Sequence, residues 1–366
     1  MRFQSQFLAI AFSLVLVSSA RAEIGYTVQI VGGSGLAINA GGLNNLGQAV
    51  GEVSRQTTGD FIAVKFGSSG REYIGPDNTS TSYAHDINDQ GAIVGSQGAD
   101  LWSQQAYVWR NGQTQVLPVL IPSSEPSSGE LLSLRPLFNV QSGAVAINNA
   151  GDIAGWFSTD AGKTSNAVIW RHDGSFSDIS ALANGAHGTI AYDINERGEV
   201  VGGTDGQQSF LLSGNEVTLL SGRALALNNF GSATGYSQVG GNVKATVWNQ
   251  QGQATLLDNR EAGDSLALSI NDAGLAVGMA DGYQPEIGRA ILWREGEAID
   301  LNSLIDPALN LQLGSAVAIN DQGQILAQTR YRQVVVLTPV PEVSPTWMVI
   351  FGGLALAGLA RRRRQS

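Results

Sequence analysis

The chain has 366 residues, of which 31 are acidic and 21 are basic, so its formal net charge is −10. It contains no cysteine, which excludes disulfides, thiolate chemistry and zinc–sulfur sites. The sequence shows no basic stripe, which argues against a nucleic acid as partner. A chain of this length can bury a sizeable core without covalent cross-links.

The first 22 residues have the pattern of a cleaved leader. Arg2 gives a positive start, Phe7–Val17 is an apolar run, and Ala20-Arg21-Ala22 places small residues at the two positions that a signal peptidase reads. We therefore predict a signal peptide over residues 1–22 and export of the remainder. An uncleaved anchor is the alternative, although the apolar run is short for a membrane span.

One sequence motif then occurs seven times. It consists of an apolar residue, Asn, two variable residues, Gly and, in six copies, a second Gly four residues later. Two copies are INDQGAIVG (Ile87–Gly95) and INNAGDIAG (Ile147–Gly155). The anchoring asparagines are Asn44, Asn88, Asn148, Asn195, Asn228, Asn271 and Asn320. Their mean spacing of about 46 residues predicts one repeated supersecondary unit.

Each repeat predicts four short antiparallel strands joined by tight turns. In the third copy these strands are Ala144–Ile147, Asp152–Phe157, Ala167–Trp170 and Ser175–Ile179. The third strand ends on tryptophan in four copies, at Trp109, Trp170, Trp248 and Trp293, with Ala63–Phe66 and Ser209–Leu212 as weaker versions. Regular spacing indicates that these tryptophans form the blade core. Four strands in such a repeat are the content of one propeller blade.

The two ends of the repeat array complement each other. The seventh copy has only three predicted strands, and an orphan strand, Tyr26–Val31, precedes the first copy. If that strand completes the last blade, the ring closes and no long edge is exposed. We predict an all-β, seven-bladed β-propeller of four-stranded blades over residues 23–340. A β-solenoid or stacked sandwiches are the alternatives.

Two intervals depart from the mean. Residues Ile121–Gln141, rich in Pro, Ser and Gly, lengthen the second repeat and predict a surface loop. The fourth repeat is the shortest and has Leu212 where other copies have tryptophan. We expect that blade to be reduced but present.

The repeat resembles a known extracellular unit, the HAF repeat. That pattern pairs an Ile-Asn-x-x-Gly-x-Val-x-Gly turn with a following Ala-x-x-Trp strand, and the resemblance covers nearly all of residues 36–337. It implies an extracellular repeat protein and carries no settled activity.

Residues 341–366 form a distinct tail. Pro341-Glu342-Val343 precedes an apolar run, Trp347–Ala360, which Arg361, Arg362, Arg363 and Arg364 follow at once. Fourteen helical residues extend about 21 Å against a hydrocarbon core of about 30 Å, so the predicted transmembrane helix is short. The arginines place its end on the cytoplasmic side.

This order of parts resembles the PEP-CTERM sorting signal of Gram-negative bacteria, although Val343 replaces the family's second proline. The resemblance implies an inner-membrane-anchored precursor, processing by exosortase, and delivery to the cell surface or an exopolysaccharide (biofilm) matrix. A plain C-terminal membrane anchor is the alternative.

No catalytic, cofactor-binding or metal-binding motif is found. A Ser-His-Asp hydrolase would need one of only three histidines as its base, and none has a suggestive neighbourhood: His85, His172 and His187. Calcium loops, phosphate loops and nucleophile elbows are absent from the sequence.

The ligand candidates are therefore weak. Asp86 and Asp193 occupy the same repeat position and would face the channel if their strands are innermost, as cation ligands or an acid–base pair; the plainer interpretation is a cap on the adjacent turn. Trp102 and Trp156 lie off the tryptophan register and are candidate carbohydrate platforms. The seven anchoring asparagines are interpreted as structural turn residues, with a ligand ring as the alternative.

The predicted extracellular location and the repeat together predict a binding or scaffolding protein. Its expected partner is an extracellular polysaccharide or another envelope component. One alternative is a propeller-type polysaccharide lyase or glycoside hydrolase, with carboxylates around the channel about 5–10 Å apart. Another is a structural envelope protein with no specific ligand.

Overall fold

The computed structural model describes residues 25–32, 38–54, 60–67, 70–74, 81–99, 103–119, 140–160, 162–182, 188–204, 208–257 and 263–340. The predicted signal peptide, the predicted tail, Trp102, His187 and most of the 121–141 segment lie outside these ranges. Among the described residues, no helix is both long and apolar enough to cross a bilayer.

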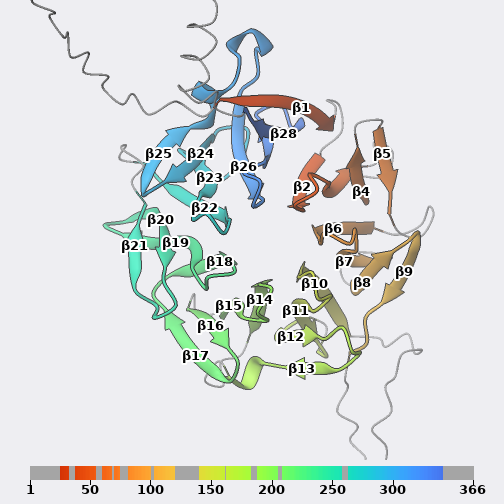
Figure 1. Cartoon of the computed structure of the whole chain (residues 1–366). Helices are drawn as coiled ribbons and strands as arrows, with labels where there is room; N and C mark the ends of the chain where they lie inside the picture. The colour runs from red at the N-terminus through yellow and green to blue at the C-terminus, as the bar shows by residue number, and fades with distance from the viewer. Residues whose placement is uncertain are drawn as a thin grey trace, which may run out of the picture. The chain divides into compact units, whose positions relative to one another are not determined.

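The described strands form seven four-stranded antiparallel sheets arranged around a central opening (Figure 1). The first strand of each of six sheets lies innermost and contacts the first strand of the next sheet, and the ring closes where β2 contacts β26. The predicted seven-bladed propeller is therefore confirmed, and the solenoid and sandwich alternatives are wrong. The ring is complete within Gly25–Val340, which forms one compact unit.

The first four blades follow the repeats in chain order. Blade 1 contains β2 (Ile38–Leu43), β3 (Ala49–Ser54), β4 (Phe61–Gly67) and β5 (Gly70–Tyr73). Blade 2 contains β6 (Thr81–Ile87), β7 (Ile93–Gly98), β8 (Gln105–Arg110) and β9 (Gln113–Val116). Blade 3 contains β10 (Gln141–Ile147), β11 (Ile153–Ser158), β12 (Asn166–Trp170) and β13 (Phe176–Asp178). Blade 4 contains β14 (Thr189–Ile194), β15 (Val200–Thr204), β16 (Ser209–Ser213) and β17 (Glu216–Leu220).

The remaining blades complete the circle. Blade 5 contains β18 (Arg223–Leu227), β19 (Ala233–Val239), β20 (Asn242–Trp248) and β21 (Ala254–Leu256). Blade 6 contains β22 (Ser265–Ile270), β23 (Ala276–Ala280), β24 (Arg289–Arg294) and β25 (Glu297–Asp300). Blade 7 contains β26 (Leu313–Ile319), β27 (Ile325–Thr329), β28 (Val334–Pro339) and β1 (Tyr26–Gly32). Short 3₁₀ turns are Ser180–Leu182, Leu301–Leu304 and Pro307–Leu309.

Blade 7 shows how the ring is closed. The N-terminal strand β1 pairs antiparallel with β28, with Val28 opposite Leu337. The amide of Val340 also donates a hydrogen bond of 2.8 Å to the carbonyl oxygen of Gly25. The orphan strand predicted from the sequence thus provides the missing fourth strand.

A β-bulge recurs near the end of the first strand of each blade. The register between first and second strands shifts between Ala84 and Asp86 in blade 2, and between Ala191 and Asp193 in blade 4. A bulge re-aims the side chains beside it. As a result, consecutive residues of one strand, such as His85 and Asp86, both line the central channel.

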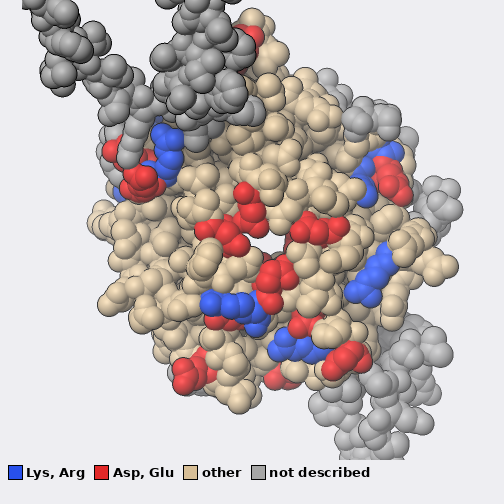
Figure 2. Space-filling view, in the orientation of Figure 1, with Lys and Arg blue, Asp and Glu red and all other residues tan. Residues whose placement is uncertain are grey.

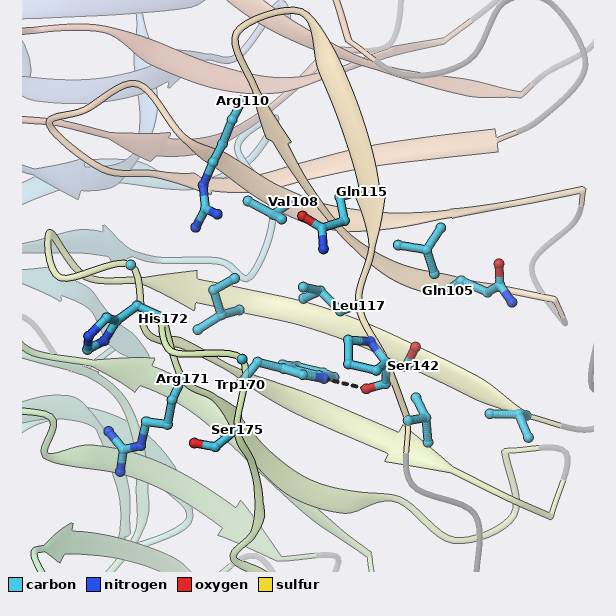
Figure 3. Close-up of a pocket in the computed structure, with 17 residues that line it drawn as sticks. Gln105, Val108, Arg110, Gln115, Leu117, Ser142, Trp170, Arg171, His172 and Ser175 are labelled. Atoms are coloured by element: carbon cyan, nitrogen blue, oxygen red, sulfur yellow. Dashed lines mark hydrogen bonds between the residues drawn. The ribbon is translucent and has the colours of Figure 1, made fainter. Parts of the chain in front are cut away.

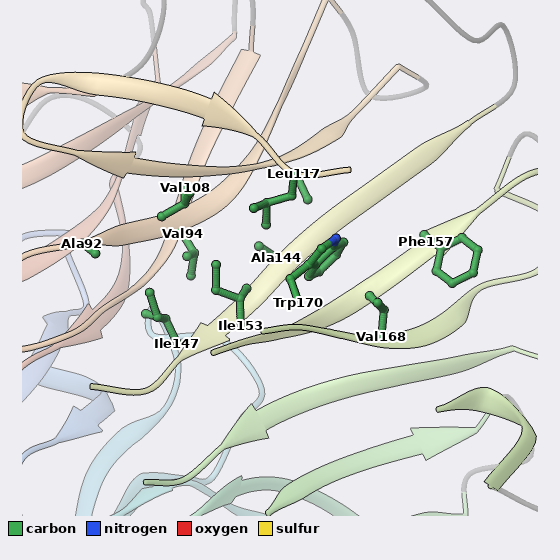
Figure 4. Packing of buried hydrophobic residues seen from close by; sticks show 11 residues of the cluster. Ala92, Val94, Val108, Leu117, Ala144, Ile147, Ile153, Phe157, Val168 and Trp170 are labelled. Carbon is green, nitrogen blue, oxygen red and sulfur yellow. The ribbon is translucent and has the colours of Figure 1, made fainter. Parts of the chain in front are cut away.

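The apolar cores lie between neighbouring blades (Figure 4). Between blades 2 and 3, Trp170 packs in one buried cluster with Val108, Leu117 and Ile153. Among the repeat tryptophans, Trp170, Trp248 and Trp293 are buried, whereas Trp109 is only partly buried. Blade 4 is a full four-stranded blade with Leu212 buried in the place of tryptophan. One boundary was wrong: Gln141 begins β10 and is buried, where a loop was predicted.

Candidate functional site

The seven anchoring asparagines form a closed ring of hydrogen bonds at one end of the channel. The side-chain amide of each donates to the carbonyl oxygen of the next anchor, as in Asn148 to Asn195 at 3.0 Å. The ring is closed by Asn320, which donates to Asn44 at 2.8 Å. Each side-chain oxygen accepts the amide hydrogen four residues on, such as that of Asp152. Because both ends of each buried side chain bind main chain, these asparagines join the blades and do not point at a ligand.

A second ring follows the first, made by the residue after each anchor. The amide of each donates to the side chain of the corresponding residue in the next blade, for example Asn229 to Asp272 at 2.8 Å. The cycle ends where Asp321 donates to Asn45 at 2.9 Å. Its members are Asn45, Asp89, Asn149, Glu196, Asn229, Asp272 and Asp321. The sequence analysis missed this ring, although every copy has Asn, Asp or Glu at that position.

Four carboxylates therefore surround one mouth of the channel, where Figure 2 shows acidic side chains around the central opening. The side-chain nitrogen of Asn45 lies 3.3 Å from a carboxylate oxygen of Asp89 and 3.3 Å from one of Asp321. Those two oxygens are thus separated by no more than twice that distance. Burial raises the pKa of Glu196, and the charges of the other three mouth carboxylates raise it further. A hydrogen bond from the Asn149 amide acts in the opposite direction.

Asp86 and Asp193 lie deeper, in the wall of a channel cavity of about 260 Å³. Asp86 accepts hydrogen bonds from the amides of Ile87 at 2.8 Å and of Ile147, in the next blade, at 2.9 Å. Asp193 does the same with Ile194 at 2.8 Å and with Leu227 of the next blade at 2.7 Å. The expected cap on the adjacent turn is wrong. These carboxylates instead connect blade 2 to blade 3 and blade 4 to blade 5.

The side chains of Asp86 and Asp193 are partly accessible from the channel, although protein surrounds both carboxylates. Burial raises the pKa of Asp86 to about 7, with the charge of Asp193 adding to it, and raises that of Asp193 to about 6. Burial also lowers the pKa of His85, whose Nδ1 lies 2.7 Å from the carbonyl oxygen of Ala144. Among the described residues, no group of three or more His, Asp and Glu side chains could hold a metal ion.

Of the two tryptophans predicted as carbohydrate platforms, only Trp156 lies in the described part of the chain. Trp102 lies outside the described residues. Trp156 is partly buried on β11, and its indole covers Gly143 of the neighbouring strand, where an added Cβ would lie 2.6 Å from the indole nitrogen. The indole therefore packs against that strand, and Trp156 remains a prediction as a sugar platform.

A lateral pocket of about 440 Å³ lies between blades 2 and 3 (Figure 3). Its floor is apolar, and the indole of Trp170 is held there by a 2.6 Å hydrogen bond to the carbonyl oxygen of Pro118. The apolar lining comprises Val108, Val116, Leu117, Pro118, Val119, Val140, Ile153 and Trp170. The polar lining includes Gln105, Arg110, Gln115, Ser142, Arg171, His172 and Ser175. The sequence analysis did not foresee this pocket.

The charges at one end of the pocket are unevenly paired. Arg171 and His172 both contact Asp152, at 2.8 Å each. Burial alone would raise the pKa of Asp152, but hydrogen bonds from His172 and Arg171 outweigh burial and hold it below its usual value. The exposed guanidinium of Arg110 has no hydrogen-bond or ion-pair partner in the described part of the chain. Among the described residues, the pocket lining therefore has one positive charge that no carboxylate pairs.

The comparisons with known proteins show distant structural similarity and no family. No known family profile matches the sequence, and no curated protein matches it. Among solved structures, a catalytically inactive virginiamycin B lyase from Staphylococcus aureus has 10% identity and a TM-score of 0.49, over 86% of this chain and 100% of that one. The β-propeller domain of the Trilobed protease from Pyrococcus furiosus has 8% identity and a TM-score of 0.47, over 84% and 96%. YCF48 from Cyanidioschyzon merolae has 12% identity and a TM-score of 0.46, over 86% and 99%.

Proposed function

We propose that this protein is an exported binding module that captures a polysaccharide of the cell surface or extracellular matrix. The observation that carries this proposal is the lateral pocket. An apolar floor with amide and hydroxyl groups at the rim is the usual character of a small-ligand site, and its volume of about 440 Å³ suits a short stretch of glycan. The apolar faces of sugar rings would pack on the floor, and their hydroxyls would meet Gln105, Gln115 and Ser175.

The proposed extracellular location rests on the two ends of the sequence. The leader over residues 1–22 supports export and removal by signal peptidase. The PEP-CTERM-like tail supports a membrane-anchored precursor, processing by exosortase and display at the surface of a Gram-negative cell. The HAF-like repeats agree with that extracellular location.

The test is a glycan array probed with residues 23–340, the segment that contains the closed ring. Ser175→Trp should lower glycan affinity at least tenfold, because the indole would occupy the pocket that Ser175 lines. Ser175 is exposed, so the substitution should leave the core intact. Gln253→Trp is the matched control. Gln253 occupies the equivalent hairpin position in blade 5, where its carbonyl accepts from Asn249 just as that of Ser175 accepts from Arg171. Absence of binding to every glycan would leave a structural envelope protein as the better account.

The acidic mouth favours a second candidate, a glycan-cleaving enzyme. Glu196 has the raised pKa of a general acid, and Asp89 and Asp321 are carboxylates on the same face. An assay for released oligosaccharides run beside the array tests this alternative. Product formation that disappears in Glu196→Gln would replace the binding proposal with an enzyme.

A further inference from the structure

We infer that the lateral pocket selects a sugar that bears a carboxylate, and that Arg110 is the residue that binds the carboxylate. The inference rests on the proposed glycan-binding function and deepens it, because it names the ligand's chemistry and the residue that recognises it.

Comparison of two repeats shows how Arg110 differs from Arg171. Arg110 follows Trp109 directly, and Arg171 follows Trp170 at the same hairpin position in blade 3. Arg171 is neutralised by Asp152, which lies four residues after its blade's anchoring asparagine. Blade 2 has the buried Ala92 at that position. The same arginine therefore has no carboxylate partner among the described residues of blade 2, and its charge can pair with another group.

Arg110 is also directed into the pocket. Figure 3 shows its side chain extending from the β8–β9 hairpin towards the blade 3 hairpin that carries His172. Its guanidinium lies against the turn between β10 and β11 of blade 3, because a Cβ added to Gly151 in that turn would sit 3.4 Å from Nη2 of Arg110. Packing against that turn positions the guanidinium, and no hydrogen bond to another described residue occupies its donors. A guanidinium binds a carboxylate through two parallel hydrogen bonds, so it can recognise that group selectively.

The remaining lining favours an acidic sugar over an acidic peptide. The uncharged polar groups are amides and hydroxyls spread along the rim, which match the several hydroxyls of a sugar ring. The net charge of the whole chain is −10, so general electrostatic attraction would not draw an anionic glycan to this protein. Recognition must come from this local positive charge.

The experiment compares trimers of uronic acids with their methyl esters, by calorimetry on residues 23–340. Esterification keeps the sugar and removes the charge. We expect at least one acid trimer to bind ten times or more tightly than its ester. Arg110→Gln should weaken binding of the acid at least tenfold, to about the affinity of the ester, and so abolish that preference. Arg294→Gln is the matched control, since Arg294 follows Trp293 at the same position in blade 6, away from the pocket.

The outcomes separate the two proposals. Equal binding of acids and esters, with both lost in Ser175→Trp, would overturn the role of Arg110 and leave the glycan-binding function standing. A preference for the acid that survives Arg110→Gln would also overturn it. Equally tight binding of triglutamate would show a general anion site in place of a sugar site. Failure of all glycans, neutral and acidic, would overturn the proposed function together with the inference.

Discussion

The channel end and the lateral wall of this propeller follow opposite rules. At the channel end, every blade contributes an asparagine with the same two kinds of hydrogen bond, from Asn44 to Asn320. At the lateral wall, blades 2 and 3 form a pocket of about 440 Å³. The hairpin arginine is paired with Asp152 in blade 3, whereas in blade 2 it has no partner in the described ranges. Features that recur in all seven blades hold the ring together, whereas a departure from the repeat marks the proposed ligand site.

The largest effect should follow removal of β1, the strand that closes the ring. Without residues 23–32, β28 becomes an open edge with unpaired main-chain groups, and Tyr26 no longer contributes to the core. We expect a loss of about 5 kcal/mol or more, a fall in Tm above roughly 10 °C, and self-association. Calorimetry and light scattering measure these quantities. An unchanged Tm would show that the ring does not depend on its closing strand.

The next largest effect should come from the asparagine ring. Asn148→Ala removes a buried acceptor of the Asp152 amide and a buried donor to Asn195. Leaving those main-chain groups unpaired should cost about 2–4 kcal/mol in urea unfolding. Asn149→Ala is the adjacent control in the more exposed second ring, and it should cost less than about 1 kcal/mol. Equal losses in both variants would contradict a special role for the anchors.

An intermediate effect concerns pH. Asp86 has a pKa of about 7 in the fold against 3.8 for a free carboxyl, so the folded state binds more protons between those values. The free energy of unfolding should therefore fall as pH rises from 4 to 7. Asp86→Ser should reduce that fall by roughly 2 kcal/mol, because the titrating group is removed. Serine is the natural residue at this position in blade 6, where Ser269 accepts from Ile319 at 3.3 Å. An identical pH slope in the variant would exclude Asp86 as the cause.

The smallest effect should come from the acidic mouth. Asp321→Asn places there the residue that Asn45, Asn149 and Asn229 already supply in other blades. Stability should change by less than about 0.5 kcal/mol, because Asp321 is exposed. The pKa of Glu196 should move down towards its usual value, since one repelling charge is lost. NMR titration of Glu196 measures that shift, and an unchanged pKa would show that the mouth carboxylates do not interact.

The fold could be predicted from the sequence because its signals are local and repeated. The turn asparagine, the third-strand tryptophan and the spare strand Tyr26–Val31 each lie within one repeat or at its end. The bonds made by those asparagines could not be predicted, since Asn148 and Asn195 are 47 residues apart and meet only in the ring.

The candidate sites were harder to foresee for the same reason. The pocket needs β8 and β9 from one blade and the β12 hairpin from the next. In the described part of the chain, Arg110 has no carboxylate partner because Ala92 stands where blade 3 has Asp152. Ala92 looks unremarkable in the sequence of its own repeat. Asp86 and Asp193 were singled out correctly as unusual, but their partners lie in neighbouring blades and only the structure shows them.

The pairing of β1 with β28 also sets an order of events in time. Tyr26 lies opposite Pro339, so the first strand to leave a ribosome or an export channel waits for nearly the whole chain before it finds its partner. Blades 1 to 6 can each form from contiguous sequence as it emerges, whereas blade 7 cannot. Contacts between such distant segments form slowly. The final and slowest step of folding should therefore be the docking of the N-terminal strand, and until then the chain presents an unpaired edge that a chaperone could bind.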